Sequence, residues 1–168
     1  MIYKPDMLNW YVVYTYPNAE RKIKNALTKC GINVYLPLEK VVRQWSDRIK
    51  EIEVPLFPNY VFVNILEKEC WKVLEIPGVV KFLTNGGKLS LISSKEIDTI
   101  KIVEEGNFEI CAETVIEIGS KVVVTQGALS GLEGRLIDKK GKKRFLLNLE
   151  SFGKIISLNI SSTSLSKV

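Results

Sequence analysis

The sequence contains no histidine. This absence removes the commonest metal ligand and the usual general base near neutral pH. Its three cysteines, Cys30, Cys70 and Cys111, lie far apart without a C-x-x-C pair, which is typical of thiols in a reducing compartment. The glycine pattern of a phosphate-binding loop is also missing. Because no nucleophile–base pair or ligand set can be assembled, we expect neither an enzyme nor a bound metal or cofactor.

Long apolar runs are missing too. None approaches the roughly 20 residues that a membrane-spanning helix requires. The first ten residues, MIYKPDMLNW, lack the apolar core of a signal peptide. We therefore expect a cytoplasmic protein that does not enter a membrane, and we expect it to be a monomer.

The composition that remains is that of a folded protein, with 46% hydrophobic and 26% charged residues among 168. The net charge of +5 is unevenly distributed. Two basic stretches flank residues 104–116, which contain four acidic side chains and no basic one. This pattern predicts two modules joined by a solvated acidic linker. A basic module is consistent with nucleic-acid binding, and equally with ordinary solubility.

The first hundred residues alternate between strand and helix patterns. Residues 9–15 read as a central strand covered on both faces. A helix follows Pro17 and Asn18 and ends at Gly31, with one apolar stripe. The remaining expected elements are strands at 32–36, 38–45, 49–54, 60–65 and 79–84, and helices at 67–75 and from Ser93 or Ser94. The order predicts an α+β domain with an antiparallel-rich sheet and helices packed on it.

Residues 54–63, VPLFPNYVFV, form the most distinctive stretch. Pro58 cannot donate a ladder hydrogen bond, so a central strand cannot pass through it. We expect a stiff turn, the elbow (residues 55–60), followed by a buried strand. The residues alone leave Phe57 equally open to two interpretations, an exposed ring at the sheet edge or a core side chain.

The C-terminal fifty residues show a different pattern. Gly127, Gly131 and Gly134 are closely spaced, and several short strands follow around the basic turn 139–143. Glycines recur where a small bent sheet needs positive φ or close backbone approach. This pattern predicts a small all-β, SH3-like barrel.

Both halves resemble one family. The elbow, the strand opening Trp10-Tyr11-Val12-Val13 and the later Pro77-Gly78-Val79 are similar to the N-terminal (NGN) domain of NusG-type transcription elongation factors. The C-terminal glycine pattern is similar to the KOW module of the same proteins. The resemblance implies an NGN domain at 8–103, the acidic linker at 104–116 and a KOW domain at 117–168. It also implies a factor that binds the clamp helices of RNA polymerase and suppresses pausing or termination.

The resemblance assigns candidate sites residue by residue. An exposed Phe57 becomes the favoured interpretation, as one of a few rigid aromatic anchors. The implied polymerase contacts are Tyr14, Phe57, Pro58 and Tyr60, with Trp71 near the opposite side of the polymerase cleft. The implied contacts to the non-template DNA strand are Arg21, Lys22, Lys24, Lys29 and Arg43, although a solvated helix face is the plainer interpretation of most of them. The implied KOW partner site is Phe152 and Lys154.

The branch of the family is less constrained. Asn59 follows Pro58 where housekeeping NusG usually has glycine, and this resembles specialised antiterminators of the RfaH and UpxY types that act at particular operons. The segment Ser151-Phe152-Gly153-Lys154 instead resembles the housekeeping contact with ribosomal protein S10 or Rho. A KOW-type protein that binds RNA or the ribosome is a further alternative, supported by the basic run 139–144.

Overall fold

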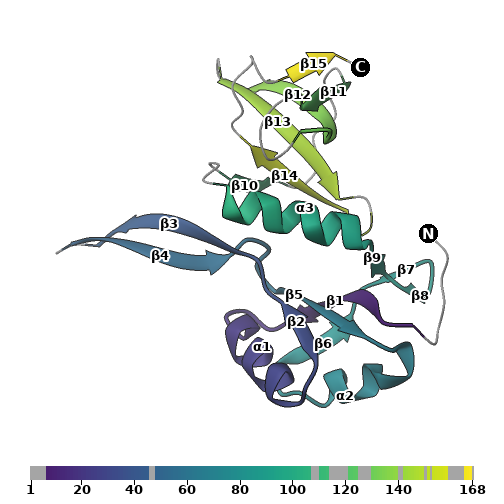
Figure 1. Cartoon of the computed structure of the whole chain (residues 1–168). Helices are drawn as coiled ribbons and strands as arrows, with labels where there is room; N and C mark the ends of the chain where they lie inside the picture. The colour runs from purple at the N-terminus through teal and green to yellow at the C-terminus, as the bar shows by residue number, and fades with distance from the viewer. Residues whose placement is uncertain are drawn as a thin grey trace. The chain divides into compact units, whose positions relative to one another are not determined.

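The computed structural model describes residues 7–45, 48–106, 110–113, 121–124, 130–139, 142–149, 151, 153–158 and 165–167 (Figure 1). Backbone contacts divide the chain into two compact units, Met1–Ser94 and Lys95–Val168. Within the described residues, no helix is long and apolar enough to cross a membrane.

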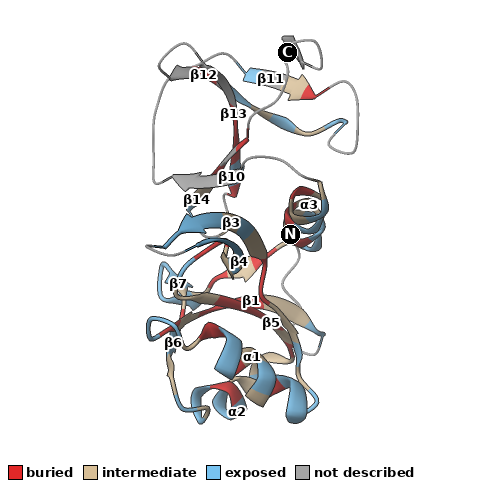
Figure 2. Ribbon diagram, turned by 90° about the vertical axis from the view of Figure 1, so that its left-hand side faces the viewer, coloured by how far each residue is buried: buried red, intermediate tan, exposed pale blue. Residues whose placement is uncertain are grey.

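The first unit is built on an antiparallel sheet with β1 (Asn9–Thr15) at its centre. Strand β1 pairs with β5 (Tyr60–Ile65) on one side and with β6 (Val79–Phe82) and β9 (Leu91–Ile92) on the other. The short strand β2 (Asn33–Tyr35) extends the sheet beyond β5. Buried residues dominate β1 and β5 (Figure 2), so the prediction of a central strand covered on both faces is confirmed.

Helices cover one face of this sheet. α1 (Glu20–Lys29) and α2 (Cys70–Leu74), which follows the 3₁₀ turn η1 (Glu67–Glu69), lie on the same side (Figure 1). Alternate residues of β1 and β5 point to this side because side chains in a strand alternate between faces. The resulting core contains Tyr11, Val13, Ile23, Leu27, Val63, Ile65, Val73 and Phe82. The predicted mixture of helices and antiparallel sheet is therefore confirmed for this unit.

A two-stranded hairpin projects from the first unit (Figure 1). Its strands β3 (Leu38–Gln44) and β4 (Ile49–Pro55) pair only with each other and match the predicted strands closely. A second, very small hairpin, β7 (Thr84–Asn85) and β8 (Lys88–Leu89), was not expected from the sequence. It turns at Gly86 and Gly87, both of which have positive φ.

The second unit opens with α3 (Ser94–Glu105) and continues as an antiparallel sheet of six strands. The carboxylate of Glu96, in the first turn of α3, accepts hydrogen bonds from the amide and hydroxyl of Ser151. Gly134 allows close approach of neighbouring strands, because a Cβ there would collide with the Phe145 ring and the Leu146 carbonyl. The strand order is β10 (Ile110–Glu113), β14 (Lys154–Leu158), β13 (Lys142–Leu149), β12 (Glu133–Lys139), β11 (Lys121–Val124) and β15 (Leu165–Lys167).

The stretch expected as a linker, residues 104–116, overlaps two of these elements. Its first two residues end α3, and residues 110–113 form β10, which pairs with β14. Four residues of edge strand among acidic neighbours are too short to produce a recognisable period in the sequence. Of the rest, Gly106 follows the helix and donates to the Ile102 carbonyl, and residues 107–109 and 114–116 lie outside the described residues.

Candidate functional site

The elbow is a tight turn between the hairpin and β5. Leu56 N–H donates to the Pro37 carbonyl at 2.9 Å, and Tyr60 N–H closes the turn on the Phe57 carbonyl at 3.2 Å. Asn59 has a φ of 71°, in the left-handed region that asparagine tolerates better than most residues. Pro58 and Asn59 are the two central residues of this turn, and their conformational preferences therefore fix it, as the sequence indicated.

Phe57 does not lie on the surface. Only 2% of the residue is exposed. Its ring packs edge-on against Phe62 of β5, with centroids 6.0 Å apart and planes at 84°. The expectation that Phe57 is an exposed anchor is therefore wrong for this conformation, because the turn directs the ring onto the sheet, where burial and an edge-to-face contact both stabilise it.

The sheet face opposite α1 is rich in aromatic residues. Tyr35 lies between Trp10, at 6.5 Å, and Phe62, at 6.1 Å between centroids. Tyr14 and Tyr60 are directly paired across β1 and β5, and their rings lie 5.4 Å apart. We call the half-buried pair Tyr14 and Tyr60, together with the exposed Pro58, the elbow surface.

The phenol of Tyr60 is held neutral. Burial, and secondly the neighbouring Tyr14, raise the pKa of Tyr60. The elbow surface therefore presents apolar ring faces, and the Tyr60 hydroxyl carries no charge near neutral pH. Such surfaces are suited to protein contacts in which a few rigid aromatic residues dominate the affinity.

Trp71 is not part of the elbow surface. It lies on α2, on the helix-covered side of the sheet, and 56% of it is exposed. The Lys72 ammonium lies 5.9 Å from its ring centroid and also binds the Glu69 carboxylate at 2.7 Å. That hydrogen bond is the main cause of the lowered pKa of Glu69. Trp71 is thus an exposed aromatic on a separate surface of the first unit.

The five predicted DNA contacts do not form one uniform patch. Lys22 and Lys29 are exposed on α1, whereas Lys24 is half-buried beside the buried stripe of Ile23 and Leu27. Lys24 lies at the border of the outer face, because it is four residues after the buried Glu20 and three before the buried Leu27, on the side of the buried stripe.

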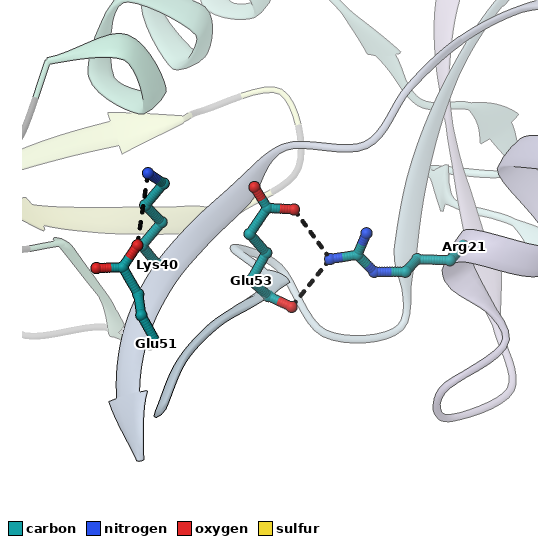
Figure 3. A network of polar contacts seen from close by, with 4 residues as sticks. All are labelled: Arg21, Lys40, Glu51 and Glu53. Atoms are coloured by element: carbon teal, nitrogen blue, oxygen red, sulfur yellow. Dashed lines mark hydrogen bonds and ion pairs between the residues drawn. The ribbon is translucent and has the colours of Figure 1, made fainter. Parts of the chain in front are cut away.

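The Arg21 side chain binds another residue of the first unit. Its guanidinium donates to the Glu53 carbonyl at 2.9 Å and approaches the Glu53 carboxylate at 3.4 Å (Figure 3). A second pair, Lys40 with Glu51 at 3.5 Å, crosses the same hairpin (Figure 3). Arg21 therefore connects α1 to the hairpin that carries Arg43.

Arg43 lies further along the hairpin. It is exposed on β3 and stands directly opposite Lys50 of β4. Like charges that face each other across strands are destabilising, and within the described residues neither side chain has an ion pair. The pair is therefore available to an anionic partner.

The predicted KOW partner site can be located only in part. Lys154 begins β14, opposite Leu149 of β13, and is half-buried. Phe152 lies outside the described residues.

Sequence reasoning missed one residue that contacts the elbow, Glu20 of α1. Its side chain is buried, and Oε1 accepts a hydrogen bond from Asn59 N–H at 2.8 Å. The only available signal was an acidic residue in the first turn of a helix, which is common on helices for electrostatic reasons.

The described part of the chain was expected to hold neither a metal nor a catalytic thiol, and two observations bear on this. No group of three or more metal-binding side chains comes together there. Burial, and secondly the neighbouring Glu67, raise the pKa of Cys70 to about 11, which makes this thiol a poor nucleophile.

The sequence is similar to that of known proteins. Residues 8–101 match the family model described as "Transcription termination factor nusG". The "Transcription termination/antitermination protein NusG" of Lactococcus lactis is 29% identical over 164 residues, which cover 86% of this chain and 85% of the relative. The protein of the same name from Rickettsia bellii is 27% identical over 185 residues, with coverages of 96% and 91%.

The fold is also similar to a solved structure. A structure described as "Domain interaction in Thermotoga maritima NusG" aligns with a TM-score of 0.60 and 19% identity, covering 98% of this chain and 99% of that one. At this identity the similarity concerns the fold alone.

Proposed function

The chain belongs to the NusG family, and on that premise we propose that it is a transcription elongation and antitermination factor that binds RNA polymerase. Its relatives carry the name "Transcription termination/antitermination protein". The proposed activity requires no chemistry. A protein that binds the elongating state more tightly than the paused state shifts the polymerase toward elongation. We place this activity in the cytoplasm and assign it to a monomer.

The elbow surface is the observation that carries the proposal. Tyr14 and Tyr60 form a preorganised ring pair, and Pro58 stands exposed beside them. Rigid aromatic side chains lose little conformational entropy on binding, so they are effective interface anchors. We assign the clamp-helix contact to these three residues. Phe57, buried against Phe62, is not part of this contact.

A second polymerase contact is proposed at Trp71. Its exposure and its place on the helix-covered side would let the domain contact two parts of the polymerase at once. Bridging the cleft in this way would hold the polymerase clamp closed.

The basic side chains are proposed to bind the non-template DNA strand. Lys22 and Lys29 on α1, and Arg43 on the hairpin, are exposed and suited to phosphate contacts. Arg21 contributes indirectly by fastening the hairpin to α1, and Lys24 contributes less because it is half-buried.

For the whole chain we propose an NGN domain at 8–103 and a KOW barrel at 117–168, joined by residues 104–116, which include the end of α3 and strand β10. The KOW barrel would bind ribosomal protein S10 or Rho through Phe152 and Lys154. A connection of this kind raises the effective concentration of the second partner near the polymerase. Loss of S10 and Rho binding by the Phe152→Ala chain would support this assignment.

Within the family we propose a specialised, operon-directed factor. The support is Asn59, which occupies a left-handed position where glycine is usual in housekeeping members. A housekeeping factor is the alternative, and genome-wide mapping distinguishes the two: occupancy confined to a few operons supports the specialised role, and occupancy of most genes contradicts it. A polymerase-independent RNA-binding protein would instead bind free RNA tightly.

The main test is a pausing assay with the polymerase of the same cell. The full chain should shorten pauses, and the Tyr14→Ser/Tyr60→Ser double variant should lose most of this effect. Tyr16→Ser is the matched control, because Tyr16 is 63% exposed and just beyond β1 but does not belong to the ring pair. Equal activity of all three proteins would contradict the assignment of the elbow surface.

A further inference from the structure

Glu20 is an unusual residue for its surroundings. Only 4% of it is exposed, and it is the one acidic side chain that is buried among the residues whose burial is described. Glutamate is almost never fully buried unless it is paired, and no described residue forms an ion pair with this carboxylate. A specific polar contact must therefore offset the cost of removing its charge from water.

That contact is with the elbow. Oε1 of Glu20 accepts the Asn59 backbone N–H at 2.8 Å, and the same peptide region is tied to the end of β1. Thr15 N–H donates to the Asn59 carbonyl at 2.8 Å, and the Asn59 side-chain amide reaches the Thr15 carbonyl at 3.4 Å. The N–H and C=O of the left-handed residue are thus both satisfied within the protein.

The position of Glu20 on α1 favours this arrangement. It is the first residue of the helix, where the backbone dipole stabilises a negative charge. Hydrogen bonds from backbone N–H to a carboxylate are roughly twice as strong as those between neutral groups. The carboxylate therefore fastens the start of α1, with its neighbour Arg21, to the turn that carries Pro58.

We propose that Glu20 is a positioning residue for the elbow surface. Its carboxylate holds Asn59 in the left-handed conformation, so that Pro58 and the Tyr14–Tyr60 pair are in their binding arrangement before a partner arrives. This inference rests on the proposed function, because it concerns the surface that we assign to polymerase binding. Preorganisation of this kind increases affinity by reducing the entropy lost on association.

Two substitutions separate the reach of the side chain from its charge. Glu20→Asp keeps the charge but withdraws the oxygen by one C–C bond, about 1.5 Å, which breaks the contact. Glu20→Gln loses the charge but keeps an accepting oxygen at the same length. Glu75→Ala, an exposed acidic residue after α2, serves as the control. If the length of the side chain decides the contact with Asn59, Glu20→Asp loses this contact and Glu20→Gln keeps it. If the charge decides it, Glu20→Asp keeps the contact and Glu20→Gln loses it.

The first measurement is amide hydrogen exchange of the full chain. Glu20→Asp should accelerate exchange of the Asn59 amide at least tenfold while the Val63 amide in β5 stays protected. Glu20→Gln, which keeps the contact in a weaker neutral form, should accelerate exchange less than Glu20→Asp does, and Glu75→Ala should stay within about threefold of the unsubstituted chain. Unchanged exchange at Asn59 in Glu20→Asp, or an equal loss of protection at Asn59 and Val63, would overturn the proposal.

The second measurement is binding to RNA polymerase. Glu20→Asp should weaken binding about tenfold, and Glu20→Gln should weaken it less than Glu20→Asp does. Full affinity of Glu20→Asp despite fast exchange at Asn59 would overturn the positioning role. If the unsubstituted chain does not bind polymerase, the proposed function fails, and the exchange measurement still decides whether Glu20 fixes the elbow.

Discussion

Replacing Phe57 by alanine should destabilise the first unit severely. The ring is almost completely buried and contacts Phe62 edge-on. Truncation of a buried phenylalanine costs about 3–5 kcal/mol, because burial is lost and a cavity remains. The edge-to-face pair accounts for about 0.5–1.5 kcal/mol of this loss. Since small domains are stable by about 5–15 kcal/mol, this single change removes a large part of the total.

Urea unfolding of the full chain measures the effect. All three tryptophans, Trp10, Trp45 and Trp71, belong to the first unit, so their fluorescence reports its unfolding alone. With a urea dependence of about 2 kcal/mol per molar, a loss of about 4 kcal/mol lowers the midpoint by about 2 M.

Two variants control for other causes. Phe57→Leu keeps most of the buried volume and should cost less than about 1.5 kcal/mol. Tyr16→Ala, at an exposed position, should change stability by no more than about 0.5 kcal/mol. A Phe57→Ala chain that loses less than about 1 kcal/mol would refute the buried position of the ring and restore the exposed-anchor interpretation.

Three further outcomes are expected. Gly134→Ala should destabilise the second unit by about 1–3 kcal/mol in thermal unfolding, because the new methyl collides with the Phe145 ring; an unchanged midpoint would contradict the close packing. The pKa of Cys70 is raised from 9.0 to about 11, so at pH 8 this thiol should react with iodoacetamide about a hundredfold more slowly in the folded chain than in urea. The folded rate should approach the unfolded rate only as the pH nears 11. Equal rates at pH 8 would argue against the shift. Arg21→Ala should cost less than about 1 kcal/mol, and 1 M salt should abolish the difference, because the side chains of the Arg21–Glu53 pair are half-exposed; a larger, salt-resistant loss would indicate another role.

Most of the first unit was predictable because its signals are local. The run from Asn9 to Thr15 is apolar and β-branched without alternation, and it is indeed the central strand. The stripe of Ile23 and Leu27 and the cap at Gly31 located α1 to within a few residues. The two-residue strands β7, β8 and β9 escaped prediction, because so short a segment has no period of its own.

The connection between the units was harder to predict. Acidic residues around residue 110 suggested a solvated linker, yet residues 110–113 pair with β14, some forty residues further along the chain. Such pairing depends on a partner distant in sequence, and charge composition carries no information about it. For α3, which was expected to end the first domain, the two observations differ: its contacts group it with the second unit, whereas the family match at residues 8–101 includes most of it with the first.

The elbow shows where sequence reasoning stops for a candidate site. Pro58 and Asn59 predicted the turn, because each of these residue types has a conformational preference that does not depend on tertiary contacts. The direction of the Phe57 ring depends instead on Phe62, and the satisfaction of Asn59 N–H depends on Glu20, 39 residues earlier. Both are tertiary facts. A carboxylate at a helix start is ordinary until the fold buries it against a left-handed residue, and from that point the helix start and the turn form one structural unit. The arrangement of the elbow surface is therefore set jointly by the turn and by the first residue of α1, and a substitution in either should alter the conformation of both.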